Sequence, residues 1–357
     1  MDIGVVIPTK DRLENLELLL ASLRRQTRPD FAIVVADDGS TDGTREMVES
    51  QSRDPVLNGR LRWVGCGPLG NMRARARNIG LANLPAETSV VVMLDSDLIL
   101  QDTAIEMYAG LHKRFPDVVI LGPVERLPPL PKADVSACLA AGQIEALRER
   151  VPPEYQARLP TGGDEPAIEV GPDYRPGMFL AADGKPGPMV RFGPAVNNAA
   201  WPLAAVWSLG GMDERMHGWG HEDLEFAARA GQAGLHCSYQ PGLWALHVWH
   251  PQPPRSGYEW QRNLDYYLRR HADPEMELGS DWSLWFHYHA ERGGNVVRCQ
   301  DSLWAVSRSG EHRLGLPGPE WAGRLGHCGH EIPVVSPEVL AAALDHGSAE
   351  AGSPLGG

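Results

Sequence analysis

The sequence predicts an α/β fold built around a parallel, doubly wound sheet, and three observations support this prediction. Short apolar runs alternate with segments of helical periodicity through residues 3–105. The apolar runs have the length of strands and end in turn-forming or charged residues. Strand–helix–strand connections of this kind place neighbouring strands in parallel. Ligands bind such sheets at the carboxyl ends of the strands.

The expected elements follow one another in a regular order. Leucines at positions 13, 16, 19, 20 and 23 give the first helix a continuous apolar face. The expected strands lie within residues 3–8, 31–40, 60–65 and 89–97, and the expected helices lie within residues 12–26, 41–51 and 71–83.

Polar side chains occur where these strands end, namely Thr9, Asp37, Asp38, Asp95 and Asp97. An unpaired carboxylate is costly to bury, so the two aspartates of VVMLDSD need an explanation. In the turn after the strand, Asp95 and Asp97 can converge on a hard cation such as Mg²⁺ or Mn²⁺. They could instead cap the following turn, and Asp37 and Asp38 could simply shape the turn in DDGSTDG.

The composition changes after the first third of the chain. Residues 126–190 are rich in proline and glycine and predict an insertion, which is either a lid over the site or a surface excursion. Within it, SACLAAGQIEALRER (136–150) predicts one helix. A compact segment follows at 191–255, then an aromatic-rich C-terminal extension at 256–346 and a disordered tail at 347–357.

Bulk properties exclude several classes of function. The formal net charge is −13, which disfavours nucleic acid as a partner. No stretch reaches the roughly 20 apolar residues of an integral membrane segment. The N-terminal segment MDIGVVIPTKDR lacks the features of a signal peptide, so we expect a cytoplasmic protein.

Four motifs occur in a fixed order: VVIPTKDRLENLELLLASLRRQT, IVVADDGSTDGT, ARARNIGLA and VVVMLDSDLIL. Together they resemble the nucleotide-sugar half of the GT-A fold, as in family-2 glycosyltransferases. The resemblance implies a Rossmann-like nucleotide-sugar half at 1–125 with a mixed central sheet. It further implies an acceptor and catalytic half at 191–255.

The resemblance assigns six residues to nucleotide binding: Pro8, Thr9, Arg12, Asp38, Arg77 and Asp95. It implies that Asp38 accepts a hydrogen bond from the base, uracil N3–H being favoured, and that Arg77 lies near the diphosphate. Asp95 would reach the ribose or a metal ion. Asp97, the second aspartate of this D-x-D motif, would bind the metal ion directly.

The segment MDERMHGWGHEDLEFAARA (212–230) resembles the W-G-x-E-D segment of β-1,4-galactosyltransferases and chondroitin-type polymerases. The resemblance implies that Asp223 is the general base, that Glu222 orients the donor or acceptor, and that Trp219 binds the acceptor sugar. His221 stands where the galactosyltransferases have a second glycine. Glu222 and Asp223 could also be there only to favour the dipole of the helix that they begin.

A third metal ligand is expected in ALHVWHP, where His247 is preferred and His250 is the alternative. An imidazole ligand favours Mn²⁺ over Mg²⁺. Most of the tryptophans at positions 201, 207, 219, 244 and 249 are expected to pack the core. Trp219 is the one expected at the acceptor, because flanking glycines expose it.

These observations predict a metal-dependent, inverting glycosyltransferase with a UDP-sugar donor and a small-molecule, glycan or peptide acceptor. Two alternatives stay open: a retaining GT-A glycosyltransferase and a non-catalytic nucleotide-sugar-binding protein. The C-terminal extension could contribute to the acceptor site or to a homodimer contact.

Overall fold

The protein is described by a computed structural model that divides into two compact units, Met1–Asn263 and Leu264–Gly357. The described residues are 2–67, 72–152, 187–188, 196–250, 259, 262–263, 266–267, 270–271, 295–299, 302–306 and 314–317. Most of the predicted insertion and C-terminal extension, and all of the predicted tail, lie outside them, so those boundaries remain predictions. None of the helices in the described ranges is long and apolar enough to cross a membrane.

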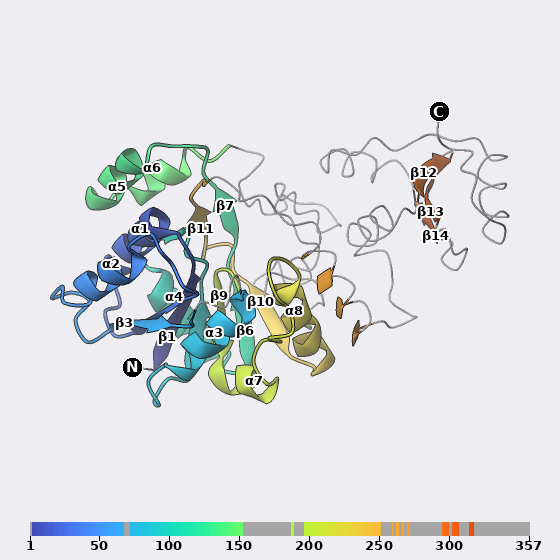
Figure 1. Ribbon diagram of the computed structural model, residues 1–357, viewed down its shortest axis with the longest axis horizontal. Helices are drawn as coiled ribbons and strands as arrows, with labels where there is room; N and C mark the ends of the chain where they lie inside the picture. The colour runs from blue at the N-terminus through green and yellow to red at the C-terminus, as the bar shows by residue number, and fades with distance from the viewer. Residues whose placement is uncertain are drawn as a thin grey trace. The chain divides into compact units, whose positions relative to one another are not determined.

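An eight-stranded sheet forms the centre of the first unit, with the order β3-β2-β1-β4-β9-β6-β10-β8 (Figure 1). Its strands are β1 (Ile3–Thr9), β2 (Ala32–Asp37), β3 (Leu61–Gly65), β4 (Val90–Met93), β6 (Val118–Leu121), β8 (Gly187–Pro188), β9 (Ala199–Pro202) and β10 (His236–Tyr239). The pairs β3–β2, β2–β1, β1–β4 and β6–β10 are parallel. β9 runs antiparallel to β4 and β6, and β8 runs antiparallel to β10, so the sheet is mixed.

Helices cover both faces of this sheet. On one face lie α1 (Leu13–Arg24), α2 (Thr44–Gln51) and α4 (Ala104–Arg114); on the other lie α3 (Arg73–Ala82), α7 (Leu203–Ser208) and α8 (Glu222–Gln232). Because side chains alternate along a strand, Val5 and Ile7 of β1 enter the first core, whereas Val6 enters the second. The predicted alternation of strands and helices is confirmed for residues 3–93.

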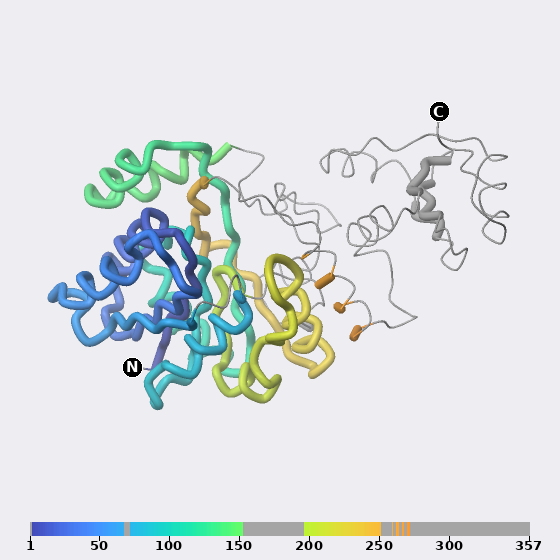
Figure 2. Tube along the Cα trace, in the orientation of Figure 1, coloured from blue at the N-terminus to red at the C-terminus, as the bar shows by residue number. Residues whose placement is uncertain are grey.

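A second, three-stranded sheet brings together segments that are far apart in the sequence (Figure 2). It consists of β5 (Leu98–Leu100), β11 (Ala245–His247) and β7 (Val124–Arg126). β11 is antiparallel to β5 and parallel to β7. This pairing sets the segment HVWH directly beside the loop that holds Asp97.

The predicted helix at 136–150 is wrong in one respect, because the structure has two helices there. α5 spans Lys132–Ala140 and α6 spans Ile144–Arg148. Gly142 lies between them with φ of 71°, a left-handed conformation that glycine adopts at low cost and that ends a helix. Both helices pack on the second sheet in a core that includes Leu139, Leu147 and Leu246.

In the second unit, three strands form an antiparallel sheet in the order β12-β13-β14. They span Asn295–Cys299, Ser302–Val306 and Leu314–Pro317. β12 pairs with β13 in antiparallel register, from Asn295 opposite Val306 to Cys299 opposite Ser302.

Asn198 joins three parts of the first unit through its buried side chain. Its Nδ2 donates to the carbonyl oxygens of Pro123 and Leu243, at 3.0 and 2.7 Å. Its Oδ1 accepts a hydrogen bond from the Tyr108 hydroxyl at 2.8 Å. The backbone of Asn198 has φ of 58°, a region that asparagine tolerates better than most residues.

Replacement Asn198→Ala is expected to lower the free energy of unfolding by about 2–4 kcal/mol, because three buried hydrogen bonds are lost and their partners stay buried. Urea unfolding followed by circular dichroism measures this change. Tyr108→Phe removes the hydroxyl alone and should cost about 1 kcal/mol. Equal losses in the two variants would contradict the joining role of Asn198.

Candidate functional site

The strand ends of the nucleotide half carry the residues that the sequence singles out. Thr9 ends β1, and the backbone N–H of Asp38 donates to the Thr9 carbonyl oxygen at 2.9 Å. Asp38 Oδ2 accepts the N–H of Met72 at 2.7 Å. Its Oδ1 and the Thr9 hydroxyl are buried without a hydrogen-bond partner among the described residues. Two buried polar atoms at the ends of the neighbouring strands β1 and β2 are therefore available to a ligand.

Asp37 has a structural role in the same turn. Its Oδ1 accepts the N–H of Ser40 at 2.8 Å, and its Oδ2 accepts the indole N–H of Trp63 at 3.0 Å. Both carboxylate oxygens are thus engaged, and the interpretation of Asp37 as a turn residue fits the structure. Pro8 lies beside Ala36 in the β1–β2 register, and Arg12 precedes α1.

Arg77, a residue that is only 2% exposed, connects three segments through its guanidinium group. Its Nη2 donates to Asp95 Oδ1 at 2.6 Å, and its Nη1 lies 3.6 Å from Glu222 Oε1. Glu222, itself buried, also accepts the N–H of Gly220 through Oε2 at 3.1 Å. The α3 helix, the loop after β4 and the start of α8 therefore share one charge network.

Asp97 meets two histidines from the end of the second sheet. Asp97 Oδ2 lies 3.0 Å from His250 Nε2 and 3.6 Å from His247 Nε2. The three possible ligand atoms, one from each residue, all lie within 4.8 Å of one another. The backbone N–H of Val248 donates to the Asp97 carbonyl oxygen at 2.8 Å and fixes this arrangement.

The donor set of this cluster fits a divalent cation. Imidazole nitrogens and a carboxylate suit Mn²⁺ or Zn²⁺, and the second oxygen of Asp97, Oδ1, is buried without a hydrogen-bond partner among the described residues. Asp95 does not join the cluster, because its carboxylate pairs with Arg77. The structure thus separates the two aspartates that the sequence leads us to expect together, and it places His250 beside His247.

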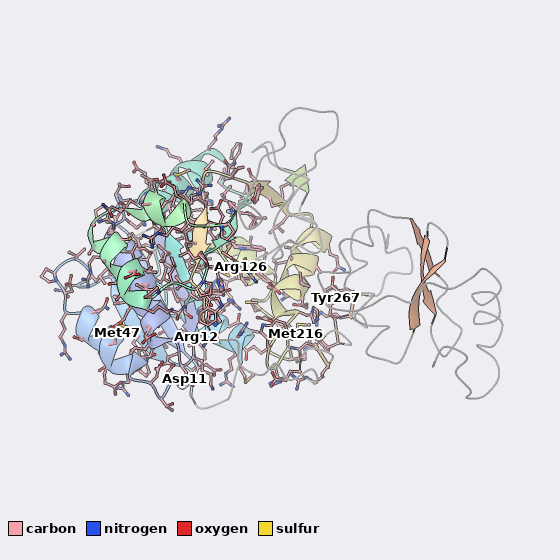
Figure 3. All side chains as sticks on the ribbon, turned by 90° about the horizontal axis from the view of Figure 1, so that it is seen from above. Asp11, Arg12, Met47, Arg126, Met216 and Tyr267 are labelled. Carbon is pink, nitrogen blue, oxygen red and sulfur yellow. The ribbon has the colours of Figure 1, made fainter. Side chains whose placement is uncertain are left out.

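Electrostatics keep Asp97 ionised. Burial by itself raises the pKa of this carboxyl, but His247, the hydrogen bond from His250 and the charge of Arg73 outweigh burial and hold the pKa well below its usual range. Arg126 on β7 lies opposite His247 on β11 in the strand register, and Figure 3 labels it. A carboxylate that stays charged is available as a cation ligand.

Lys132 is a member of the site that the sequence did not reveal. Its ammonium donates to Asn15 Oδ1 at 2.6 Å. Burial lowers the pKa of Lys132, while Glu14 and Asp97 act in the opposite direction and Arg12 adds to the lowering. Lys132 is the first residue of α5 and has no sequence motif around it, so only the packing of α5 against α1 reveals its neighbours.

The W-G-H-E-D loop has an unusual backbone at its third position. His221 adopts φ of 67° immediately before α8, in the region where glycine is preferred. The histidine thus follows the backbone path that a glycine would take. Asp223 is half-buried, and its Oδ1 accepts the N–H of Leu224 at 2.8 Å.

A later segment holds this loop in place. Asn263 Nδ2 donates to the carbonyl oxygens of His217 and Gly220, both at 2.9 Å. Glu259 accepts the backbone N–H of Trp219 at 3.2 Å. Side chains of this later segment therefore hold the backbone of residues 217–220, on the N-terminal side of Asp223.

The five tryptophans between positions 201 and 249 differ in burial. Trp201 and Trp244 are buried, as predicted. The prediction is wrong for Trp207 and Trp249, which are 44% and 48% exposed. Trp219, expected to be exposed, is half-buried.

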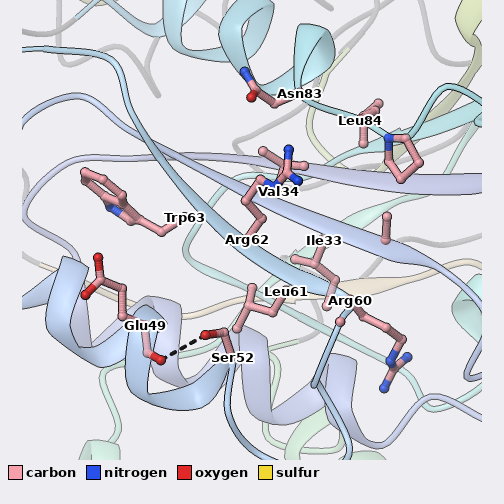
Figure 4. Close-up of a pocket in the computed structure, with 13 residues that line it drawn as sticks. Ile33, Val34, Glu49, Ser52, Arg60, Leu61, Arg62, Trp63, Asn83 and Leu84 are labelled. Carbon is pink, nitrogen blue, oxygen red and sulfur yellow. Dashed lines mark hydrogen bonds between the residues drawn. The ribbon is translucent and has the colours of Figure 1, made fainter.

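A separate hollow of about 510 Å³ lies along the edge strand β3 (Figure 4). Its walls include Arg60, Leu61, Trp63 and Leu84. None of the predicted site residues lines it, so we do not assign the candidate site to this hollow.

The first third of the chain matches a known family. Residues 4–130 match the family described as Glycosyl transferase family 2. The chain is 30% identical over 286 residues to validoxylamine A glucosyltransferase of Streptomyces hygroscopicus subsp. jinggangensis, covering 77% of this chain and 62% of that protein. It is 27% identical over 266 residues to chondroitin synthase of Escherichia coli, covering 73% of this chain and 36% of that protein. The chain therefore spans less than two thirds of the length of these relatives.

A solved structure supports the fold. The crystal structure of residues 1–349 of Staphylococcus aureus TarS in complex with UDP-GlcNAc matches with a TM-score of 0.53 at 16% identity, covering 81% of this chain and 71% of that chain. The fold is thus GT-A-like, as the sequence predicts.

Replacement Arg77→Met is expected to lower the free energy of unfolding by about 3 kcal/mol, because Glu222 stays buried without its counter-charge. The double variant Arg77→Met/Glu222→Gln should recover a large part of that loss. Chemical denaturation of the two variants and of wild type measures the difference.

Arg45→Met is the matched control, since Arg45 pairs with Glu49 on an exposed helix surface. The Arg45 guanidinium also lies 4.5 Å from the centre of the Trp63 ring, so the replacement should cost a little stability, well below the loss expected for Arg77→Met. If the double variant were as unstable as Arg77→Met, packing rather than charge would explain the contribution of Arg77.

Proposed function

Because residues 4–130 form a glycosyl transferase family 2 domain, we propose that the protein is a metal-dependent, inverting glycosyltransferase. It transfers a sugar from a UDP-sugar to a hydroxyl group of a small-molecule, glycan or peptide acceptor. The observation that carries this proposal is the charge network of Arg77, which joins the strand ends of the nucleotide half to Glu222 at the start of α8.

The polar atoms at the ends of β1 and β2 support UDP as the nucleotide. Asp38 Oδ1 is a buried acceptor, and uracil N3–H is a donor that matches it. Arg77 is suited to the diphosphate, and Pro8, Thr9 and Arg12 border the same strand ends. The names of the relatives point to glucose or N-acetylglucosamine as the first sugars to test.

Asp97, His247 and His250 would hold the metal ion, with Mn²⁺ favoured over Mg²⁺ because two ligands are imidazoles. When bound, the ion supplies positive charge that stabilises the departing diphosphate. Asp95 stays paired with Arg77 and keeps the guanidinium oriented toward the same strand end. A role for Asp95 at the ribose or the metal remains a prediction.

Asp223 is the residue that we assign as general base. Glu222 is held in a fixed position by Arg77 and by the N–H of Gly220. A carboxylate in a fixed position is suited to orient a substrate rather than to accept a proton. Asp223 follows Glu222 on α8 and is half-buried, so an acceptor hydroxyl could approach within about 3 Å of its carboxylate. The acceptor oxygen would attack the anomeric carbon from the face opposite the diphosphate, as the bond to UDP breaks and Asp223 accepts the hydroxyl proton. Attack from that face inverts the anomeric centre. Trp219 would contact the acceptor.

Nucleotide binding and metal dependence can be tested in one series. UDP-glucose and UDP-N-acetylglucosamine with Mn²⁺ should raise the melting temperature, because a ligand that binds only the native state stabilises it. Asp97→Asn should keep the fold and lose at least about 100-fold of Mn²⁺-dependent UDP release, since a carboxylate ligand is lost. EDTA should have the same effect on wild type. Near-normal UDP release by Asp97→Asn would contradict the metal assignment.

Asp223→Asn tests the base. The amide cannot accept the proton, so kcat should fall by about 10²–10⁴-fold while the affinity for the UDP-sugar stays within about twofold. Kinetics with a panel of acceptors and calorimetric titration of the donor separate the two effects, and NMR of the anomeric proton reports the stereochemistry. A parallel loss of donor affinity and turnover would argue against the assignment.

A further inference from the structure

Trp249 is an exposed indole in the middle of the proposed metal-binding segment. It lies between Val248 and His250, which are buried, yet 48% of its own surface is exposed. Consecutive Cα atoms are about 3.8 Å apart, so the backbone of Trp249 lies directly beside that of His250, a member of the cluster with Asp97 and His247.

The backbone around Trp249 is held on both sides. The N–H of Val248 donates to the carbonyl oxygen of Asp97 at 2.8 Å, and the carbonyl oxygen of His247 accepts the N–H of Leu127 at 3.0 Å. His250 on the other side is fixed by Asp97 at 3.0 Å. An aromatic ring on so constrained a segment loses little further freedom when a ligand covers it, which favours binding.

We propose that Trp249 is a stacking platform for a pyranose ring at this site, an inference that rests on the proposed function. The apolar C–H face of a sugar covers the indole, and the polar edges of the ring remain free for hydrogen bonds. The pyranose belongs either to the donor sugar or to the acceptor, and the experiment below distinguishes these sources. Trp249 thereby adds an aromatic contact to the charged groups that hold the diphosphate.

Trp207 provides a matched control within the same unit. It is 44% exposed, almost as much as Trp249, but it lies on α7. Figure 1 shows α7 and β11 at different ends of the first unit. Loss of an exposed tryptophan as such can therefore be separated from loss of this particular ring.

The test compares wild type, Trp249→Ala, Trp249→Phe and Trp207→Ala by calorimetric titration in the presence of Mn²⁺. The probes are UDP, UDP-glucose, UDP-N-acetylglucosamine and methyl β-D-glucopyranoside. Trp249→Ala should bind UDP within about twofold of wild type but lose about fivefold to tenfold in affinity for a sugar-bearing probe, the scale of one aromatic contact. Trp249→Phe should keep most of that affinity, and Trp207→Ala should behave as wild type.

A loss confined to the UDP-sugars assigns the pyranose to the donor, and a loss confined to the glycoside assigns it to the acceptor. Either result supports the platform. Unchanged sugar affinity in Trp249→Ala, equal loss of UDP affinity, or a wild type that gains nothing from either kind of sugar overturns it. A wild type that binds no UDP overturns the proposed function instead, while the glycoside titration still decides the role of Trp249.

Discussion

The buried guanidinium of Arg77 is the constraint on which the candidate site depends. A charge taken out of water costs several kcal/mol unless it is paired, so Arg77 requires carboxylates in fixed positions. Asp95 supplies one from the loop after β4, and Glu222 supplies another from the first turn of α8. Any movement of α8 away from the nucleotide half would separate the buried carboxylate of Glu222 from Arg77. The same pairing therefore stabilises the fold and holds the start of α8, which includes Asp223, beside α3 and the loop after β4.

A second set of contacts holds His247 and His250 in position beside Asp97. Backbone hydrogen bonds connect Val248 to Asp97 and Leu127 to His247, so the small sheet fixes the separation between the aspartate and both imidazoles. The resulting cluster needs strands from three regions of the chain, β5, β7 and β11. A cation bound there would therefore meet ligand atoms that the protein already holds close together.

The family match covers only some of the groups proposed to act in the reaction. It spans residues 4–130 and therefore includes Asp38, Arg77 and Asp97. The groups proposed for proton removal and for imidazole ligation, Asp223, His247 and His250, come later. The proposed reaction needs both halves, because the first would provide the nucleotide and diphosphate contacts and the second would provide the base.

The sequence by itself determined the alternation of strands and helices, the polar strand ends and the GT-A-like fold, because periodicity and local turn chemistry are encoded over short distances. It also singled out Asp97, Glu222 and Asp223 as functional candidates. The break at Gly142 was within reach of such analysis, since a glycine inside a helical pattern is a local signal. Contacts between distant segments were not. Only the tertiary structure decided that Asp95 turns to Arg77 while Asp97 turns to His247 and His250, and that Trp249 stays exposed where Trp244 is buried. Those outcomes depend on which strands become neighbours, and a strand's neighbours are fixed by the packing of the whole unit rather than by its own residues.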